Sequence, residues 1–78
     1  MNKNEILAKV QEIFQDVLDN EDIEISFDTT SDDVDEWDSL SHIQLIVAIE
    51  KTFNLKFTSK EIMSWANVGD MCECIANK

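Results

Sequence analysis

Proline is absent from this 78-residue chain, tyrosine is absent too, and glycine occurs once. The chain therefore has few of the residues that break helices, and no stretch alternates apolar and polar residues as a half-buried strand does. An apolar content of 44% argues against wholesale disorder. We predict an all-α chain that forms one small domain, residues 1–78, with no room for a second core.

Cysteine and histidine are too few for a metal or redox site. Cys72 and Cys74 are two positions apart, which places them on different faces of a helix, and the chain has one histidine. Asp33, Asp35 and Asp38 begin like a calcium-binding loop, but the glycine and glutamate that complete such a loop are missing. We expect two reduced, ordinary cysteines and no metal site.

Basic residues are scarce as well: 6 face 17 acidic ones, for a net charge of −11. No lysine or arginine lies between Val10 and Glu50, where most of the acids fall. This argues against nucleic acid as a ligand and favours partners with basic patches. No apolar run approaches the ~20 residues of a membrane span, and no apolar signal segment begins the chain. We expect a cytoplasmic protein without membrane insertion.

Apolar spacing and capping residues predict a small four-helix bundle with a short third helix. The predicted helices cover residues 4–19, residues 38 or 39 to 53, residues 59–64 and residues 68–76. A long loop, residues 20–38, joins the first two. We expect its spaced apolar residues to pin it across the bundle. These residues are Ile23, Ile25, Phe27, Val34 and Trp37.

Local signals mark the ends of the later helices. Thr58 and Glu61 match a capping box, and Asn67 is a candidate cap for the last helix. Ser41 and Gln44 match a second capping box, one turn into the second helix. Asn54 suits the left-handed position after that helix. The short third helix should bury Ile62, and Met63 is a second candidate for burial. The last helix should face inward with Val68, Met71, Cys72 and Ile75.

The second helix has more large apolar residues than one buried face needs. One stripe consists of Leu45, Ile49 and Phe53, joined by Ile46 and Ala48. An adjacent stripe consists of Leu40, Ile43 and Val47. Either the helix is buried nearly all round, or the second stripe is a docking face.

The acidic loop that ends in Asp38-Ser39-Leu40, followed by this apolar helix, resembles the acyl or peptidyl carrier protein family. Chain length, helix spacing and the segment 68–71 also fit, so the resemblance covers nearly the whole chain. It implies that Ser39 is esterified with 4'-phosphopantetheine and that Asp38 helps a phosphopantetheinyl transferase recognise the site. A helix N-terminus suits the resulting phosphodiester, because free N–H groups and a partial positive charge meet the anion there.

The resemblance also implies a non-catalytic carrier that meets acyl- or aminoacyl-loading and transfer enzymes. We expect a monomer. Leu45, Ile46 and Ile49 match positions that line the interior, where some carriers shelter an acyl chain. We expect partner contacts at Asp35, Glu36, Leu40, Ile43, Gln44, Val47 and Glu50.

Trp37 stands where the fatty-acid carriers have a small residue, and Ser41, Gln44 and Lys51 stand at positions often acidic in them. Polyketide, nonribosomal peptide or cell-surface polymer pathways therefore fit at least as well as fatty acid synthesis. An acidic module that imitates nucleic acid or inhibits a basic partner is the alternative. A serine hydrolase has little support, since no GxSxG elbow is present, and His42 is expected to be a surface residue near the arm.

Overall fold

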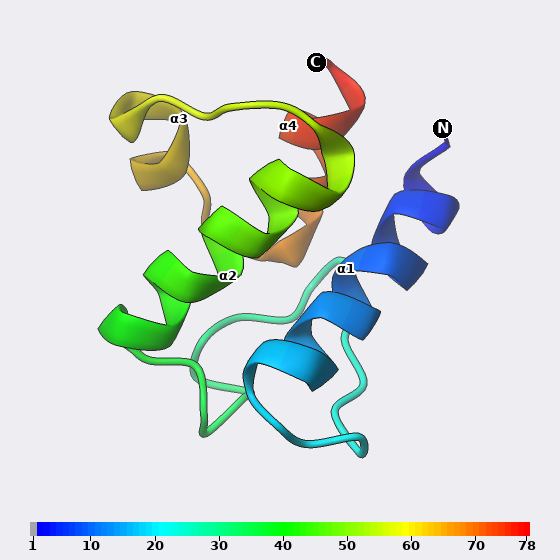
Figure 1. The fold of residues 1–78 in the computed structure, drawn as a ribbon, viewed down its shortest axis with the longest axis vertical. Coiled ribbons are helices and arrows are strands. Elements are labelled where there is room, and N and C mark those ends of the chain that lie inside the picture. The colour runs from blue at the N-terminus through cyan, green and yellow to red at the C-terminus, as the bar shows by residue number, and fades with distance from the viewer. Residues whose placement is uncertain (1) are drawn as a thin grey trace.

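The computed structural model describes residues 2–78, and four helices pack around one core in it. The helices are α1 (Lys3–Val17), α2 (Ser39–Phe53), α3 (Ser59–Met63) and α4 (Val68–Ala76). α1 packs against both α2 and α4, and Figure 1 shows the short α3 set to one side of α2. No strand lies within residues 2–78. The predicted all-α bundle with a short third helix is confirmed.

Every helix begins with a side chain that accepts a backbone N–H from its first turn. The four caps are Asn2, Asp38, Thr58 and Asn67. The predicted caps Thr58 and Asn67 are confirmed, and so is the left-handed Asn54 after α2, with φ 54°. α1 ends before the predicted position because Asp19 takes a left-handed φ of 52°, which stops the helix.

The core is formed by α1, α2, α4 and the long connection. Its fully buried large side chains are Ile6, Val10, Phe14, Leu45, Ile49, Val68, Met71 and Cys72. The predicted inward face of α4 is confirmed. The expectation for Met63 was wrong: its side chain is 84% exposed. α3 is a short helix of 5 residues. Ile62 faces the bundle, and its side chain is half-buried rather than fully buried.

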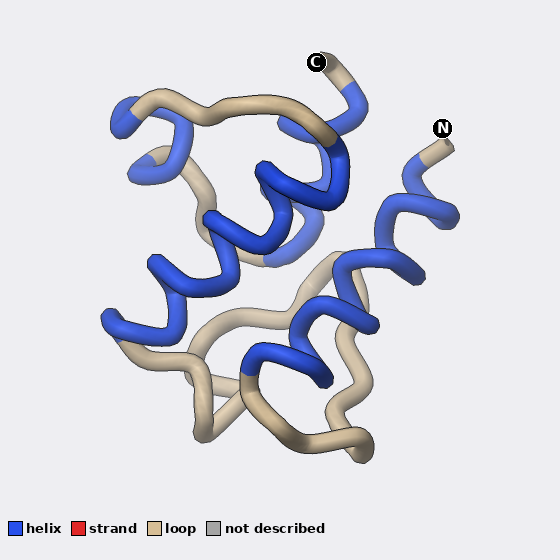
Figure 2. The backbone as a smooth tube through the Cα atoms, viewed as in Figure 1, coloured by secondary structure: helices blue, strands red, loops and turns tan. Residues whose placement is uncertain are grey.

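The long connection between α1 and α2 wraps around one end of the bundle and returns across it (Figure 2). Four of its five predicted anchors are buried and Phe27 is half-buried, which confirms that they pin the loop. Its backbone is also tied to the start of α4. The N–H of Val68 donates to the carbonyl of Thr29 at 2.9 Å, and the N–H of Gly69 donates to that of Phe27 at 2.7 Å. The loop therefore supplies acceptors for the free first-turn N–H groups of α4.

None of the helices in residues 2–78 has the length and apolar character needed to cross a membrane.

Glu61 ties α3 to the end of the chain, which makes stability depend on pH. Its carboxylate accepts hydrogen bonds from Lys78 Nζ at 2.8 Å and from the N–H of Thr58 at 2.8 Å. The Lys78 hydrogen bond, followed by the Thr58 N–H, lowers the pKa of Glu61 to about 2. A carboxylate with a lowered folded-state pKa stabilises the fold above its unfolded pKa, and the stabilisation is lost as the pH falls toward the folded value. We expect Glu61→Gln to flatten the decline of the melting temperature between about pH 4.5 and 2. An unchanged pH profile in this variant would contradict the assignment.

Candidate functional site

The start of α2 is fixed by a reciprocal pair of hydrogen bonds between Asp38 and Ser41. Asp38 Oδ1 accepts the N–H of Ser41 at 2.9 Å, and Ser41 Oγ accepts the N–H of Asp38 at 2.8 Å. Ser41 Oγ can also donate to the carbonyl of Glu36 at 2.9 Å, and Ser41 is only 8% exposed. The prediction of a capping box from Ser41 to Gln44 was therefore wrong. Asp38 is the last residue before the helix, so the box forms one turn earlier.

This capping arrangement leaves Ser39 exposed as the first residue of α2. Within residues 2–78 the Ser39 hydroxyl takes part in no side-chain hydrogen bond, whereas the neighbouring Ser41 hydroxyl is fully used. The hydrogen bond from the N–H of Ser41 lowers the pKa of the Asp38 carboxyl group and favours its ionised form. The result is an accessible primary alcohol at a helix N-terminus with a negative charge beside it.

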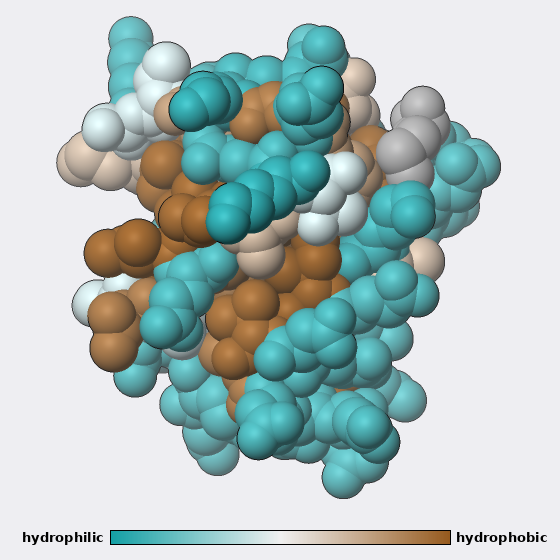
Figure 3. Space-filling view, viewed as in Figure 1, coloured by the Kyte–Doolittle hydropathy of each residue, from teal (hydrophilic) through white to brown (hydrophobic). Residues whose placement is uncertain are grey.

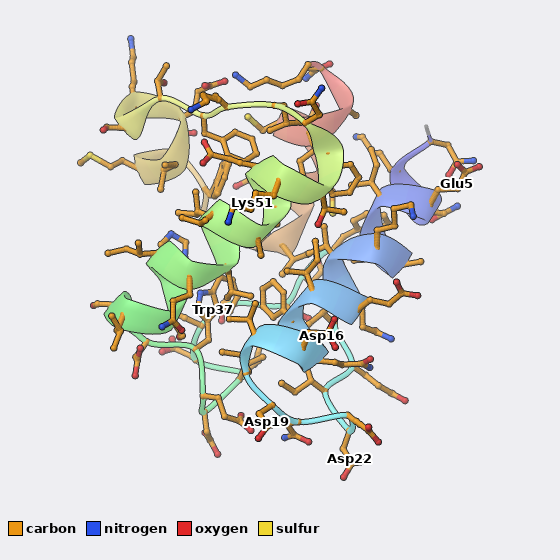
Figure 4. All side chains as sticks on the ribbon, viewed as in Figure 1. Glu5, Asp16, Asp19, Asp22, Trp37 and Lys51 are labelled. Atoms are coloured by element: carbon orange, nitrogen blue, oxygen red, sulfur yellow. The ribbon has the colours of Figure 1, made fainter. Side chains whose placement is uncertain are left out.

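A pocket of about 490 Å³ opens beside Ser39. Its walls come from the long connection, the first turn of α2, the turn after α3 and the start of α4. The lining residues are Ser31, Trp37, Asp38, Ser39, His42, Trp65, Ala66, Asn67 and Met71. Trp37 lies under the first half of α2 (Figure 4) and packs edge-on against Phe14, with 4.9 Å between the ring centres. Trp37 thus connects the pocket lining to the core.

His42 is part of this aromatic wall and is half-buried, so the expectation of a plain surface histidine is corrected. Trp37 Nε1 donates a hydrogen bond to His42 Nδ1 at 3.0 Å, and the two rings stack with their centres 5.9 Å apart. The hydrogen bond requires a neutral imidazole with its proton on Nε2. Burial lowers the pKa of His42 below its ordinary value and favours the same neutral form.

Acidification should break the hydrogen bond between Trp37 and His42 at the pocket wall. Because the folded state lowers the pKa of His42, its contribution to stability is complete above the unfolded value near 6.5 and is lost as the pH falls through the folded value. Protonated Nδ1 can no longer accept the indole N–H of Trp37. We expect tryptophan emission to change as the pH falls below about 6.5, and His42→Gln, which can still accept that N–H, to remove the change. An identical change in both proteins would show that another group is responsible.

The two apolar stripes of α2 differ in their exposure to solvent. Leu45, Ile46 and Ile49 face the interior and are at most 8% exposed. Leu40, Ile43 and Val47 are 68%, 60% and 43% exposed. Figure 3 shows apolar side chains that project over α2 from a largely hydrophilic surface. Of the two alternatives left open by the sequence, burial nearly all round is therefore excluded.

The polar side chains expected to contact partners are not equally exposed. Asp35 and Glu36 are exposed in the loop before α2, and Glu36 accepts a hydrogen bond from Asn20 Nδ2 at 2.7 Å. Gln44 is exposed on the helix itself. Glu50, by contrast, is half-buried, and its carboxylate accepts the N–H of Phe57 at 2.9 Å. Glu50 therefore holds the connection between α2 and α3.

Two residues of the site were missed by sequence reasoning. Ser41 was assigned to the wrong capping pair, although the spacing Asp38-x-x-Ser41 fits a reciprocal cap. Trp65 was given no role from the sequence, yet its ring lines the pocket and meets Phe57 edge-on, with 4.9 Å between the ring centres. A tryptophan in a short polar turn was the available signal, since such a large side chain seldom lacks a packing partner.

The residues at this end of α2 fit a phosphopantetheine arm. Its phosphodiester needs an accessible hydroxyl, which Ser39 supplies, and first-turn N–H groups lie beside it. The adjoining pocket offers the aromatic faces of Trp37 and Trp65 to the apolar parts of an arm. Ser59 is also exposed at the start of a helix, but it does not line this pocket.

Comparison with known proteins gives the same picture. The profile of the family described as "Phosphopantetheine attachment site" matches residues 8–75. The acyl carrier protein of Streptococcus pyogenes serotype M3 is 36% identical over 94% of this chain and 95% of its own length. The acyl carrier protein of Acidothermus cellulolyticus is 34% identical over 99% of this chain and 92% of its own length.

A solved structure agrees in fold. The solution structure of a holo acyl carrier protein from Geobacter metallireducens has a TM-score of 0.88 to this chain and 37% sequence identity, and the match covers 94% of this chain and 84% of that one. These similarities give no support to the alternative of an acidic inhibitor or nucleic-acid mimic. The chain belongs to the acyl carrier protein family, as a carrier that bears 4'-phosphopantetheine and tethers acyl intermediates rather than catalysing a reaction.

Proposed function

We propose that Ser39 is the residue that carries the 4'-phosphopantetheine arm. The observation that carries this proposal is the contrast between two serines in one helical turn. The Ser39 hydroxyl is exposed and opens on a pocket, while the Ser41 hydroxyl is buried and bonded to the backbone. A transferase can therefore reach the first hydroxyl and not the second.

The chain's own residues position the attachment point and leave the chemistry to the arm. Asp38 caps the helix and so sets the direction of Ser39, and exposed Leu40 adjoins the site as a contact for the transferase. When bound, the arm supplies a terminal thiol on which an acyl or aminoacyl group is held as a thioester. His42 need not act as a base toward Ser39, because its Nδ1 already accepts the Trp37 indole N–H.

A carrier of this family meets a transferase that attaches the arm and enzymes that load and use the cargo. The finer assignment is our proposal: these enzymes contact the stripe of Leu40, Ile43 and Val47 and present basic residues to Asp35 and Glu36. Exposure of all five side chains supports it. We also propose a monomeric, cytoplasmic carrier, in keeping with a net charge of −11 that opposes self-association.

Incubation with coenzyme A and a broad-specificity phosphopantetheinyl transferase tests the proposal. The protein is expected to gain the mass of one arm and one thiol that reacts with a maleimide without denaturant. Cys72 is buried and burial raises its pKa to about 11, while burial and then the hydrogen bond to Glu61 raise the pKa of the half-buried Cys74 thiol, so the arm's thiol should react before either. No mass gain, in a reaction where an established carrier protein is fully modified, would overturn the proposal.

A further inference from the structure

The pocket beside Ser39 contains one group that can become a cation. Among residues 2–78, those that line the pocket include no lysine or arginine, and Asp38 and His42 are its two titratable groups. The sequence itself has no lysine or arginine between Val10 and Glu50. A phosphodiester on Ser39 would therefore stand beside a carboxylate of the same sign of charge. His42 is the lining residue that can offset this charge.

The backbone at the start of α2 has already used part of its capacity to bind an anion. The capping box engages the N–H groups of Asp38 and Ser41, which are two of the four that a helix start leaves free. The Ser41 hydroxyl donates to the carbonyl of Glu36 at 2.9 Å. The cap therefore leaves a place beside Ser39 for a side-chain donor from the next turn of the helix.

The His42 ring lies on the side of the helix that carries Ser39. Residues three apart on a helix are neighbours, and helical side chains lean toward the preceding turn. The ring follows that direction, because its Nδ1 accepts the indole N–H of Trp37, which precedes α2, at 3.0 Å. It stacks on Trp37 and meets Trp65 edge-on, with 5.9 Å and 6.4 Å between the ring centres. The two tryptophans therefore fix the ring beside the start of the helix.

The proton of the neutral His42 ring is on the nitrogen that has no partner. Because Nδ1 is an acceptor, the proton is on Nε2. Within residues 2–78 Nε2 makes no hydrogen bond, and Trp65 Nε1 is the one buried side-chain nitrogen or oxygen without a partner, so Nε2 is accessible to solvent. Ser39 and His42 line the same pocket. An unused donor is thus fixed in place, three residues from the exposed hydroxyl.

We propose that His42 Nε2–H donates a hydrogen bond to a phosphate oxygen of the arm on Ser39 and so directs the first part of the arm along the pocket that Trp37 and Trp65 line. This inference rests on the proposed function, because it requires the arm on Ser39. An adjacent anion favours the protonated form of an imidazole, so attachment of the arm should increase the proton affinity of His42. In the unmodified protein burial acts in the opposite direction and lowers the pKa of His42.

Nitrogen-15 NMR titration of the His42 side chain tests the inference, and its signals are unambiguous because the chain has one histidine. The unmodified protein is compared with the protein that carries the arm, after peptide mass mapping has placed the arm on Ser39. We expect the unmodified ring to have its proton on Nε2 above about pH 7.5. The arm should increase the proton affinity about threefold or more. Ser39→Ala, carried through the same reaction, is the matched control and should keep the affinity of the unmodified protein.

Phosphorus-31 NMR gives a second readout, because a phosphodiester itself neither gains nor loses a proton near neutral pH. The resonance of the arm should shift with pH at the midpoint of His42, and the shift should be absent from the His42→Gln protein with its arm. An arm on Ser39 with an unchanged proton affinity of His42, or a phosphorus shift that persists in His42→Gln, would overturn the inference alone. A protein that gains no arm on Ser39 would overturn the proposed function and the inference together.

Discussion

Ser39→Ala is expected to abolish attachment of the phosphopantetheine arm completely. Transfer of the arm requires an oxygen that becomes the ester of the phosphodiester, and the substitution removes the accessible hydroxyl at the head of α2. The substituted site is exposed and outside the core, so the free energy of unfolding should change by no more than about 0.5 kcal/mol. Intact mass spectrometry after incubation with coenzyme A and transferase measures the first effect, and thermal melting measures the second.

Ser59→Ala is the matched control for this experiment. Ser59 is likewise an exposed serine that opens a helix directly after a residue in a capping box. It lacks the flanking Asp38, Leu40 and aromatic pocket of Ser39. The control should accept one arm like the parent. An arm on Ser39→Ala, or its loss in Ser59→Ala, would show that the carrier serine lies elsewhere.

Gly69→Ala should destabilise the fold by about 1–3 kcal/mol, which is a large share of the stability of a small domain. A Cβ at this position would stand 2.7 Å from the carbonyl oxygen of Phe27 and 3.3 Å from its Cβ. The 2.7 Å hydrogen bond from the Gly69 N–H to that carbonyl would have to stretch, and its neighbour from Val68 to Thr29 would be disturbed with it. The substitution therefore separates the long connection from α4.

The sign of the effect makes this experiment decisive. Gly69 lies in α4, where helix propensity alone would make alanine more stable by about 1 kcal/mol. The contact with Phe27 predicts the opposite sign. Urea unfolding followed by the emission of the two tryptophans gives the free energy directly. A more stable Gly69→Ala protein would mean that the loop is not held against α4 as the structure describes.

Local signals explain why most of the fold could be predicted. A cap such as Thr58 or Asn67, and a left-handed terminator such as Asn54, depend on neighbours within a few residues along the chain. Met63 could not be placed in the same way. Its exposure depends on how a single-turn helix meets the rest of the bundle, which the apolar pattern of five residues does not determine.

The candidate site could be predicted in part. The assignment of Ser39, which stays a proposal, rests on a short motif and a helix start, both local. The pocket beside it could not be predicted, because its walls come from segments far apart in the chain, as with Trp37 and Trp65. The same holds for the neutral state of His42, which depends on a hydrogen bond from Trp37 and on burial. Likewise, only the structure shows that the carboxylate of Glu50 accepts a hydrogen bond from the backbone N–H of Phe57.

The position of the arm is measured most directly by peptide mass mapping of the protein purified from its own host. The account predicts one phosphopantetheine, with or without a thioester-bound cargo, on the fragment that contains Asp38-Ser39-Leu40, and fragment ions that place it on Ser39. An arm on any other serine, or a chain that stays unmodified in the host while the host's other carriers are modified, would contradict it.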